Sequence, residues 1–384
     1  MMEIPFHKPF IAEEEISEVV DTLKSGWITM GPKTIRFEEE FGRYVSSKHA
    51  IAVNSGTAAL HLAVKAINLN PGDEVIIPTT TFTATGEVVC YGNAVPVIVD
   101  VDKETHNIDV QAIEKAITPR TKAIIPVHIA GQPCDMDEII QLARTHHLYV
   151  IEDAAHAIPA WYRKRRIGAI ADITCFSFYS TKPLATGEGG MVTTEKEAWA
   201  ERMRTLRLHG ISKDAWKRYS KGGSWYYEVI EPGFKYNMTD LQASLGIAQL
   251  KKVDWLWEKR KEIARRYTEA FASTGGIIPP SVKADRESAW HLYIIKLQIE
   301  ALNIDRNGFI EKLRERGIET SVHFIPLHRQ PFYKNTFGLM QEAFPNAEWV
   351  YERSISLPIY PGMTDQEVNY VIEQVTDLCR KSKR

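Results

Sequence analysis

The sequence is short of the features that mark several classes of protein. Its 384 residues include only four cysteines, none in a CxxC pair or at metal-ligand spacing, so we expect free thiols. No apolar run approaches the ~20 residues that span a bilayer, and the opening MMEIPFHKPF lacks the basic and apolar stretches of a signal peptide. The formal net charge of -2 gives no reason to expect nucleic acid as a partner. We therefore expect a cytoplasmic protein without a membrane or nucleic-acid partner.

What the sequence does contain is an alternation of short apolar runs with helical segments. AIAVNSG (50–56) is followed by TAALHLAVKAI (57–67), and EVIIPTTTF (74–82) is followed by TATGEVVCYG (83–92). The runs are rich in Val and Ile and nearly free of polar residues, as strands covered on both faces must be. The pattern predicts an α/β fold with a parallel sheet, whose ligands bind at the carboxyl ends of the strands.

The character of the chain changes after about Gln249. A long charged helix is expected over 250–273, and fewer strands follow before a terminal helix over 364–381. We predict a large domain over 1–250 and a smaller C-terminal domain over 251–384.

Several candidate site residues stand where the predicted strands of the large domain end. Gly56 and Thr57 open a helix whose free N–H groups suit a phosphate, although Ser55 or Thr57 could simply cap that helix. Phe82 could lie over a flat ligand, but for a lone phenylalanine core filling is commoner. Asp153 ends a buried strand, where a carboxylate needs a cation unless it caps a following helix.

The segment CFSFYSTKPLATGEGGMVTT (175–194) places Lys182 in a polar turn after an apolar strand. Burying an ammonium group is energetically costly, so a lysine at the end of a buried strand indicates a functional role. Ser177 points to the same side of its strand as Cys175 and could donate to a phosphate. A phosphate site, a flat platform, a buried carboxylate and this lysine together are what pyridoxal phosphate requires.

From end to end the chain resembles the sugar aminotransferases of the DegT/DnrJ/EryC1/StrS family. The motifs that carry the resemblance are SGWITMGP (25–32), NSGTAALHLA (54–63), EVIIPTTTFTAT (74–85), VIEDAAHA (150–157), FSFYSTKPLATGEGGMV (176–192), PGFKYNMTDLQASLGIAQL (232–250) and VHFIPLH (322–328). The resemblance implies a fold-type I architecture, with a large domain built on a mostly parallel central sheet and a smaller α+β C-terminal domain.

The resemblance also implies a role for each candidate residue. Lys182 would carry pyridoxal 5'-phosphate, Asp153 would pair with the ring nitrogen, and His156 would lie near the phenolic oxygen. The remaining cofactor-binding residues would be Phe82 on the ring, and Gly56, Thr57, Ala58 and Ser177 on the phosphate. Asn237 would reach the phosphate of a neighbouring subunit in a homodimer, although it could instead cap the next helix. Thr29, His323 and His328 are expected on the sugar side, and no metal is expected.

The resemblance implies transfer of an amino group from an amino acid to a nucleotide-linked keto sugar. The usual donor in the family is L-glutamate. Some motifs look closest to members that aminate the 4-position of UDP-4-keto sugars. The basic-aromatic segment 211–229 could grip the nucleotide-sugar, whereas RKRR (163–166) is expected at a solvated hairpin tip. A dehydratase of the same family would replace the lysine by histidine, so Lys182 argues against it. A DNA-binding regulator is disfavoured by the near-neutral charge.

Overall fold

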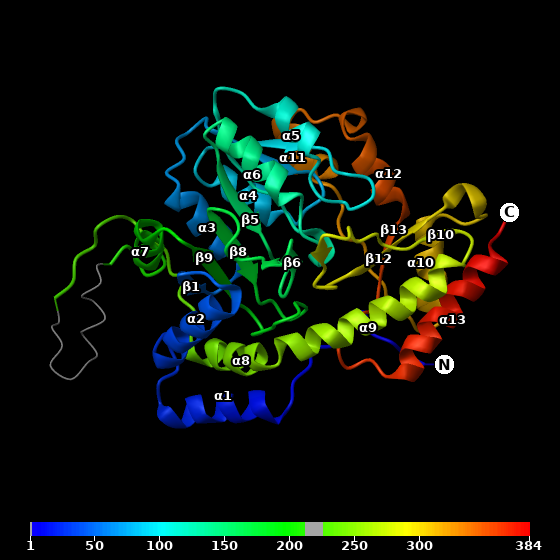
Figure 1. Cartoon of the computed structure of the whole chain (residues 1–384), viewed down its shortest axis with the longest axis horizontal. Coiled ribbons are helices and arrows are strands. Elements are labelled where there is room, and N and C mark those ends of the chain that lie inside the picture. Colours follow the sequence, from blue (N-terminus) through cyan, green and yellow to red (C-terminus); the bar gives the residue numbers. More distant parts are fainter. Residues whose placement is uncertain (1, 212–225) are drawn as a thin grey trace.

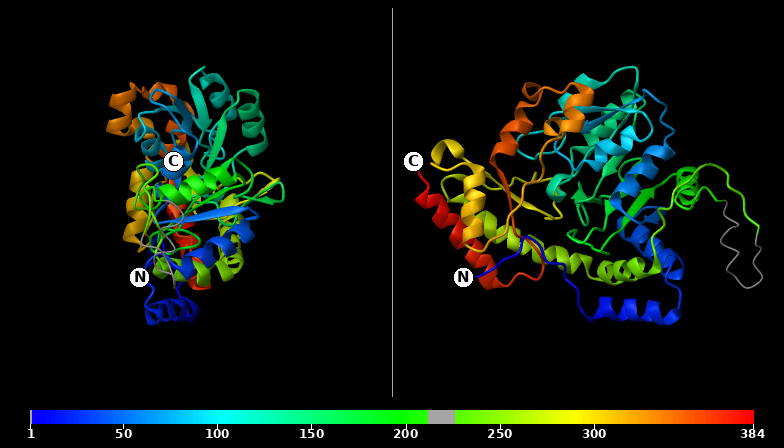
Figure 2. Two further views of the ribbon diagram at one scale, coloured as in Figure 1. Left: turned by 90° about the vertical axis from the view of Figure 1, so that its left-hand side faces the viewer. Right: turned by 180° about the vertical axis from the view of Figure 1, so that it is seen from behind.

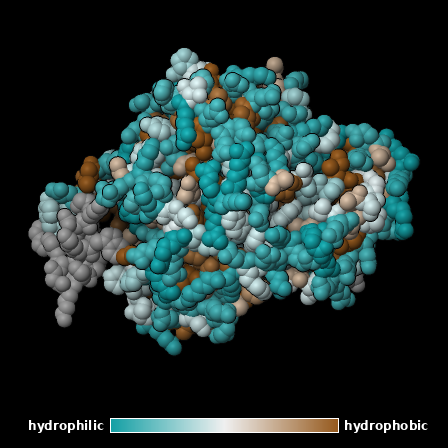
Figure 3. Space-filling view, in the orientation of Figure 1, coloured by the Kyte–Doolittle hydropathy of each residue, from teal (hydrophilic) through white to brown (hydrophobic). Residues whose placement is uncertain are grey.

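The computed structural model describes residues 2–211 and 226–384 (Figure 1). The loop expected over 211–229 therefore falls largely outside the described residues. No helix in the described part is long and apolar enough to cross a membrane, and hydrophilic residues cover most of the face shown in Figure 3.

A seven-stranded sheet forms the centre of the larger part of the molecule. The four strand pairs from β8 to β3 are parallel, whereas β9 runs antiparallel to both of its neighbours, β1 and β8, so the expected mostly parallel sheet is confirmed. Across the sheet the strands are β1 (His49–Val53), β9 (Gly190–Thr194), β8 (Ile173–Ser177), β5 (Tyr149–Asp153), β4 (Thr121–Ile124), β2 (Glu74–Pro78) and β3 (Val95–Val99).

Helices cover both faces of this sheet because its side chains alternate between two apolar cores. On β1, Ala50 and Ala52 join one core, whereas Ile51 and Val53 join the other. The first core includes side chains from α2 (Pro32–Val45), α5 (Val110–Ala116), α6 (Met136–Thr145) and α8 (Asp240–Lys251). The second includes side chains from α3 (Gly56–Ala66), α4 (Ala84–Cys90) and α7 (Glu197–Leu206).

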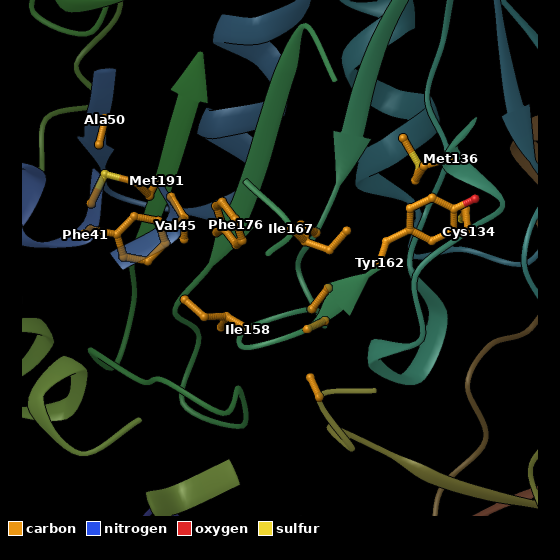
Figure 4. Packing of buried hydrophobic residues seen from close by; sticks show 14 of the residues in the cluster. Phe41, Val45, Ala50, Cys134, Met136, Ile158, Tyr162, Ile167, Phe176 and Met191 are labelled. Atoms are coloured by element: carbon orange, nitrogen blue, oxygen red, sulfur yellow. The ribbon is translucent and has the colours of Figure 1, made fainter. Parts of the chain in front are cut away.

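Figure 4 shows part of the first core, where Phe41, Phe176 and Met191 gather beside the sheet. The Phe41 and Phe176 rings meet edge to face with centroids 5.0 Å apart, a favoured aromatic geometry. This packing fixes β8, the strand that leads to the Lys182 turn.

The C-terminal part has a core of its own. The helix α9 (Val253–Ala272) follows α8 and extends beneath both parts of the molecule (Figures 1 and 2). It packs against a small antiparallel sheet of β10 (Ile277–Ile278), β12 (Tyr293–Leu297) and β13 (Ser354–Leu357), together with α10 (Arg306–Glu315) and α13 (Asp365–Lys381).

The proposed division at residue 250 is crossed by two segments. Near the N-terminus, Ile4 packs in the C-terminal core. In the opposite direction, Leu327 from the turn η4 (Leu327–Arg329) and Tyr333 from α11 (Pro331–Phe337) pack in the second core of the large sheet. These segments link the two parts of the molecule around the end of the sheet where the site lies.

The RKRR segment forms a hairpin tip, as the sequence predicts. The strands β6 (Trp161–Tyr162) and β7 (Arg165–Arg166) pair antiparallel, and β11 (Arg286–Glu287) adds to the edge. Arg163 lies 2.5 Å from Asp137, and Arg165 lies 2.9 Å from the same carboxylate. Both arginines therefore form ion pairs with an acidic residue of the same chain.

Candidate active site

A cavity of about 570 Å³ lies at the carboxyl ends of the central strands. Residues that follow β1, β2, β5 and β8 line it from the large domain, as parallel sheets predict. His291, His323 and Ile359 line it from the C-terminal part. The cavity therefore lies between the two parts of the molecule.

One end of the cavity is the N-terminus of α3. The Ser55 hydroxyl accepts a hydrogen bond from the Ala58 N–H at 3.0 Å, so Ser55 is the helix cap. The N–H groups of Gly56 and Thr57 belong to the first turn, where no helix carbonyl is available to them. A Cβ added to Gly56 would lie 2.8 Å from Ser177 Cβ, so only glycine leaves this corner open. The end of the cavity fits a phosphate.

Ala58 was expected to contact the phosphate, but it does not line this end of the cavity. Its N–H is already bonded to the cap, and its side chain is buried away from the cavity in the second core. The phosphate candidates that line the cavity are Gly56, Thr57 and Ser177.

Asp153 lies in the floor of the cavity at the end of β5. Its Oδ2 accepts from the Thr85 hydroxyl at 2.8 Å, and its Oδ1 accepts from the Ala155 N–H at 3.1 Å. Residues 154–160 form turns and no helix, so the helix-cap alternative is wrong. Burial raises the pKa of Asp153, while Thr85, Ala155 and the nearby Lys182 act in the opposite direction. The carboxylate is fixed by these two hydrogen bonds, and no cation of the described residues forms an ion pair with it.

Glu152, the neighbouring acid, faces away from the cavity because side chains alternate along a strand. Its carboxylate lies 3.1 Å from His128 Nε2 and accepts from the Thr174 hydroxyl at 2.7 Å. The two acids that end β5 thus have separate environments.

Lys182 follows β8 in a turn that its own N–H closes onto the Tyr179 carbonyl at 2.8 Å. The chain returns to β9 through Gly187, whose φ of 81° suits glycine. Burial lowers the pKa of Lys182 to about 8, and Asp153 partly offsets this. The unprotonated amine that a nucleophile requires is therefore far more abundant near neutral pH than for an ordinary lysine.

Histidines line the opposite end of the cavity. The rings of His156 and His291 are 4.5 Å apart, and neither Nδ1 has a hydrogen-bond partner among the described residues. His323 Nδ1 lies 2.8 Å from the Ser356 hydroxyl, and His7 Nε2 lies 3.2 Å from the Ser180 carbonyl. Burial, reinforced by neighbouring cations, lowers the pKa of all four imidazoles. The sequence analysis missed His7 and His291, which no motif marks.

Phe82 lies at the cavity wall rather than in a core. Its side chain is 59% exposed, which excludes the core-filling alternative. Its ring centroid is 6.1 Å from that of Phe324, so the two rings border the same opening.

Three predicted residues are not brought into the cavity of the single chain. Thr29 is exposed and outside the lining. His328 is buried elsewhere, with its ring nitrogens 2.7 Å from the Thr79 hydroxyl and 2.6 Å from Glu348. Asn237 also lies outside the lining, and its Oδ1 accepts from Lys235 Nζ at 2.5 Å.

The alternative role of Asn237 as a helix cap is wrong. The cap of α8 is Thr239, whose hydroxyl accepts from the Gln242 N–H at 3.2 Å while the Gln242 side chain bonds back. The Asn237 side chain is therefore not required for the start of α8.

Known proteins resemble this chain over almost its whole length. It is 58% identical to an uncharacterized protein, MJ1066, of Methanocaldococcus jannaschii, covering 99% of this chain and 98% of that one. It is 52% identical to the spore coat polysaccharide biosynthesis protein SpsC of Bacillus subtilis, covering 98% and 97%. Among solved structures, the PMP form of the putative sugar aminotransferase Spr1654 from Streptococcus pneumoniae superposes with a TM-score of 0.93 at 37% identity, covering 99% of this chain and 98% of that chain.

The residues that line the cavity fit the cofactor of these relatives, since a cradle for phosphate, a fixed carboxylate and an activated lysine face one space. The model of the DegT/DnrJ/EryC1/StrS aminotransferase family matches residues 9–376. This chain belongs to that family of sugar aminotransferases, which depend on pyridoxal phosphate and have the fold-type I architecture.

Proposed function

We propose that this protein transfers the amino group of L-glutamate to the keto carbon of a nucleotide-linked sugar, at its 4-position. The observation that carries the proposal is the shared space of Lys182, Asp153 and the α3 N-terminus. The relationship to SpsC, a polysaccharide biosynthesis protein, supports a sugar as the acceptor. The cavity of about 570 Å³ is large enough to admit part of a nucleotide-sugar beside the cofactor.

The proposed chemistry assigns separate tasks to the residues of the site. When bound, pyridoxal phosphate supplies an aldehyde that takes up the amine and a ring that stabilises negative charge on the attached carbon. Gly56, Thr57 and Ser177 would hold the phosphate, and Asp153 would keep the ring nitrogen protonated. Lys182 Nζ, with its pKa lowered to about 8, would hold the cofactor and, in each half of the reaction, would move the proton between the amine-bearing carbon of the bound substrate and the benzylic carbon of the cofactor.

We further propose that the protein acts as a homodimer in the cytoplasm. The helix α1 (Glu13–Ser25) packs on α8 but exposes Ile16, Val20 and Leu23 on one face, and such an apolar stripe is suited to a subunit contact. In the dimer, Asn237 would reach the phosphate held by the partner. The four unpaired cysteines suit a reducing compartment.

The function is tested with 15N-labelled L-glutamate and a panel of UDP-, dTDP- and GDP-linked keto sugars. For one 4-keto substrate we expect a product in which a 15N-labelled amino group has replaced the keto oxygen. Loss of water from the sugar without nitrogen uptake would instead indicate a dehydratase. If no sugar in the panel gains nitrogen while free 2-oxo acids do, the proposed acceptor is wrong.

A further inference from the structure

A fully buried arginine lies behind the histidine end of the cavity. Arg260 on α9 is 1% exposed, and its Nη1 donates to the Ile359 carbonyl at 2.6 Å. Its Nε has no hydrogen-bond partner, and no carboxylate of the described residues lies within ion-pair distance of the guanidinium. Burial lowers its pKa to about 9, so the group is still charged at neutral pH.

An isolated buried charge is strongly unfavourable unless an opposite charge approaches it. Ile359, whose carbonyl accepts from Arg260, lines the cavity. His7 and His291 also line the cavity, and the field of Arg260 reaches both of them, lowering the pKa of each. This end of the cavity is therefore a space beside Arg260 in which a counter-charge could lie.

His156 and His291 can each offer an N–H group at this end of the cavity, where there is very little negative charge. His156 and His291 line the cavity and are each 5% exposed. The Nδ1 of each ring is buried with no hydrogen-bond partner among the described residues, so it is the Nε2 edge of each ring that can meet a ligand. The acids that line the cavity are Asp153, whose two oxygens already accept hydrogen bonds, and the exposed Glu188. No group of three or more His, Cys, Asp or Glu side chains in the described part could hold a metal ion. The donor set fits an anion.

We propose that His156 and His291, with the charge of Arg260 behind them, bind the α-carboxylate of the amino donor. The inference rests on the proposed function and specifies how that site recognises the amino acid. His156, His291 and His7 all lie within the electrostatic reach of Lys182, where the reacting carbon must lie.

The alternative anions fit this position less well. An α-carboxylate is joined directly to the reacting carbon, whereas the diphosphate of a nucleotide-sugar is several bonds from a 4-keto carbon. The phosphate of the cofactor has its own cradle at Gly56 and Ser177. The donor carboxylate is thus the anion that must reach this end during the reaction.

The test uses two ligands that differ in one group. 2-Methyl-L-glutamate and 4-amino-4-methylpentanoate both lack the α-hydrogen and so bind without transamination, but only the first has an α-carboxylate. Their dissociation constants are measured by calorimetry on the holoenzyme of wild type, Arg260→Met and His291→Leu. Arg266→Met is the matched control, because Arg266 lies on the same helix but pairs with the exposed Asp365 at 2.5 Å.

We expect 2-methyl-L-glutamate to bind wild type more tightly than its partner, and each site variant to lose about ten- to a hundredfold of that affinity. Binding of 4-amino-4-methylpentanoate and the absorbance of the bound cofactor should not change, and Arg266→Met should match wild type. Arg260→Lys keeps the charge and should retain most of the affinity, which covers the case in which Arg260→Met does not fold.

The inference is overturned if His291→Leu binds 2-methyl-L-glutamate as wild type does, if a folded Arg260→Met does so, or if both ligands lose affinity equally. Its failure is distinct from failure of the proposed function. If only this inference fails, wild type still moves 15N from glutamate to a sugar. If the proposed function fails, wild type moves no label to any sugar.

Discussion

The two ends of the cavity are built from different kinds of hydrogen-bond donor. The phosphate end consists of the first residues of α3 and Ser177, with backbone N–H groups and hydroxyls as donors. The histidine end draws on four distant segments, which contribute His7, His156, Arg260 and His291. The phosphate end is formed by consecutive residues of one strand, turn and helix. The histidine end requires the C-terminal part to pack against the large sheet.

The difference affects how each end responds to change. Backbone donors at a helix terminus are held by the helix itself and cannot be deleted, but a side chain at the wrong place can block them. Side-chain donors can be removed singly, and buried imidazoles respond to pH. Substitutions should therefore distinguish the ends.

The largest effect is expected at Lys182, which lines the same cavity as both ends. Lys182→Ala should abolish transamination and the absorbance band of lysine-bound cofactor, because no other described lysine lines the cavity. The spectrum and 15N transfer are the measurements. Lys261→Ala is a control that should keep the band, because Lys261 lies outside the cavity lining and pairs with Glu287 at 3.3 Å. A Lys182→Ala protein that turns over at the wild-type rate would refute the assignment.

A loss of several orders of magnitude is expected for Asp153→Asn. The amide keeps the shape and can keep the Thr85 contact, but removes the charge that holds the ring nitrogen protonated. Turnover is measured at saturating cofactor. The neighbouring Glu152→Gln is the matched control, since that acid faces away from the cavity. If Asp153→Asn keeps more than about a tenth of the activity, a barrier change of only ~1.4 kcal/mol, the role of Asp153 is structural.

At the phosphate end, Gly56→Ala should weaken cofactor binding by about tenfold or more, since the added methyl would lie 2.8 Å from Ser177 Cβ. Cofactor affinity is measured by fluorescence titration of the apoenzyme. Gly92→Ala is the control, because nothing lies within 4 Å of its added Cβ. Equal affinities in the two variants would contradict a phosphate at this corner.

Asn237→Ala should lower cofactor affinity by about one to two powers of ten if its amide donates to the phosphate of the partner. Mixing this variant with Lys182→Ala, under conditions of subunit exchange and limiting cofactor, should restore activity, because one site of the heterodimer then carries neither lesion. The double mutant mixed with wild type is the control and should have both of its sites damaged. No recovery from the single variants, despite exchange, would exclude the shared site.

The smallest effect concerns pH at the histidine end. Burial, and then Lys182, lower the pKa of His323 to about 4. The unfolded chain therefore binds more protons between pH 6.5 and 4, so the free energy of unfolding falls as pH falls through this window. His323→Asn should reduce that slope by at most about 1.4 kcal/mol per pH unit. Denaturant unfolding at pH 5 and 7 measures it, with exposed His146→Asn as control; an unchanged slope in His323→Asn would mean that this imidazole is not held neutral.

The sequence alone determined the parallel strands, the phosphate corner and the positions of Lys182 and Asp153 in one cavity. These features are local: a buried strand, a turn and a helix start occupy consecutive residues, and the carboxyl ends of parallel strands must meet at one edge. Even the wrong alternatives, such as a helix after Asp153, concerned neighbouring residues.

Only the tertiary structure decided which distant side chains reach the cavity. His328 was expected there together with His323, yet it bonds to Thr79 and Glu348 instead, while Arg260 and His291 come close to the site without any motif. No spacing in the sequence encodes these positions, because they follow from how α9 and the small sheet pack against the large one. Side-chain contacts between elements far apart in the chain depend on that packing, whereas strand ends and helix starts depend on their own residues.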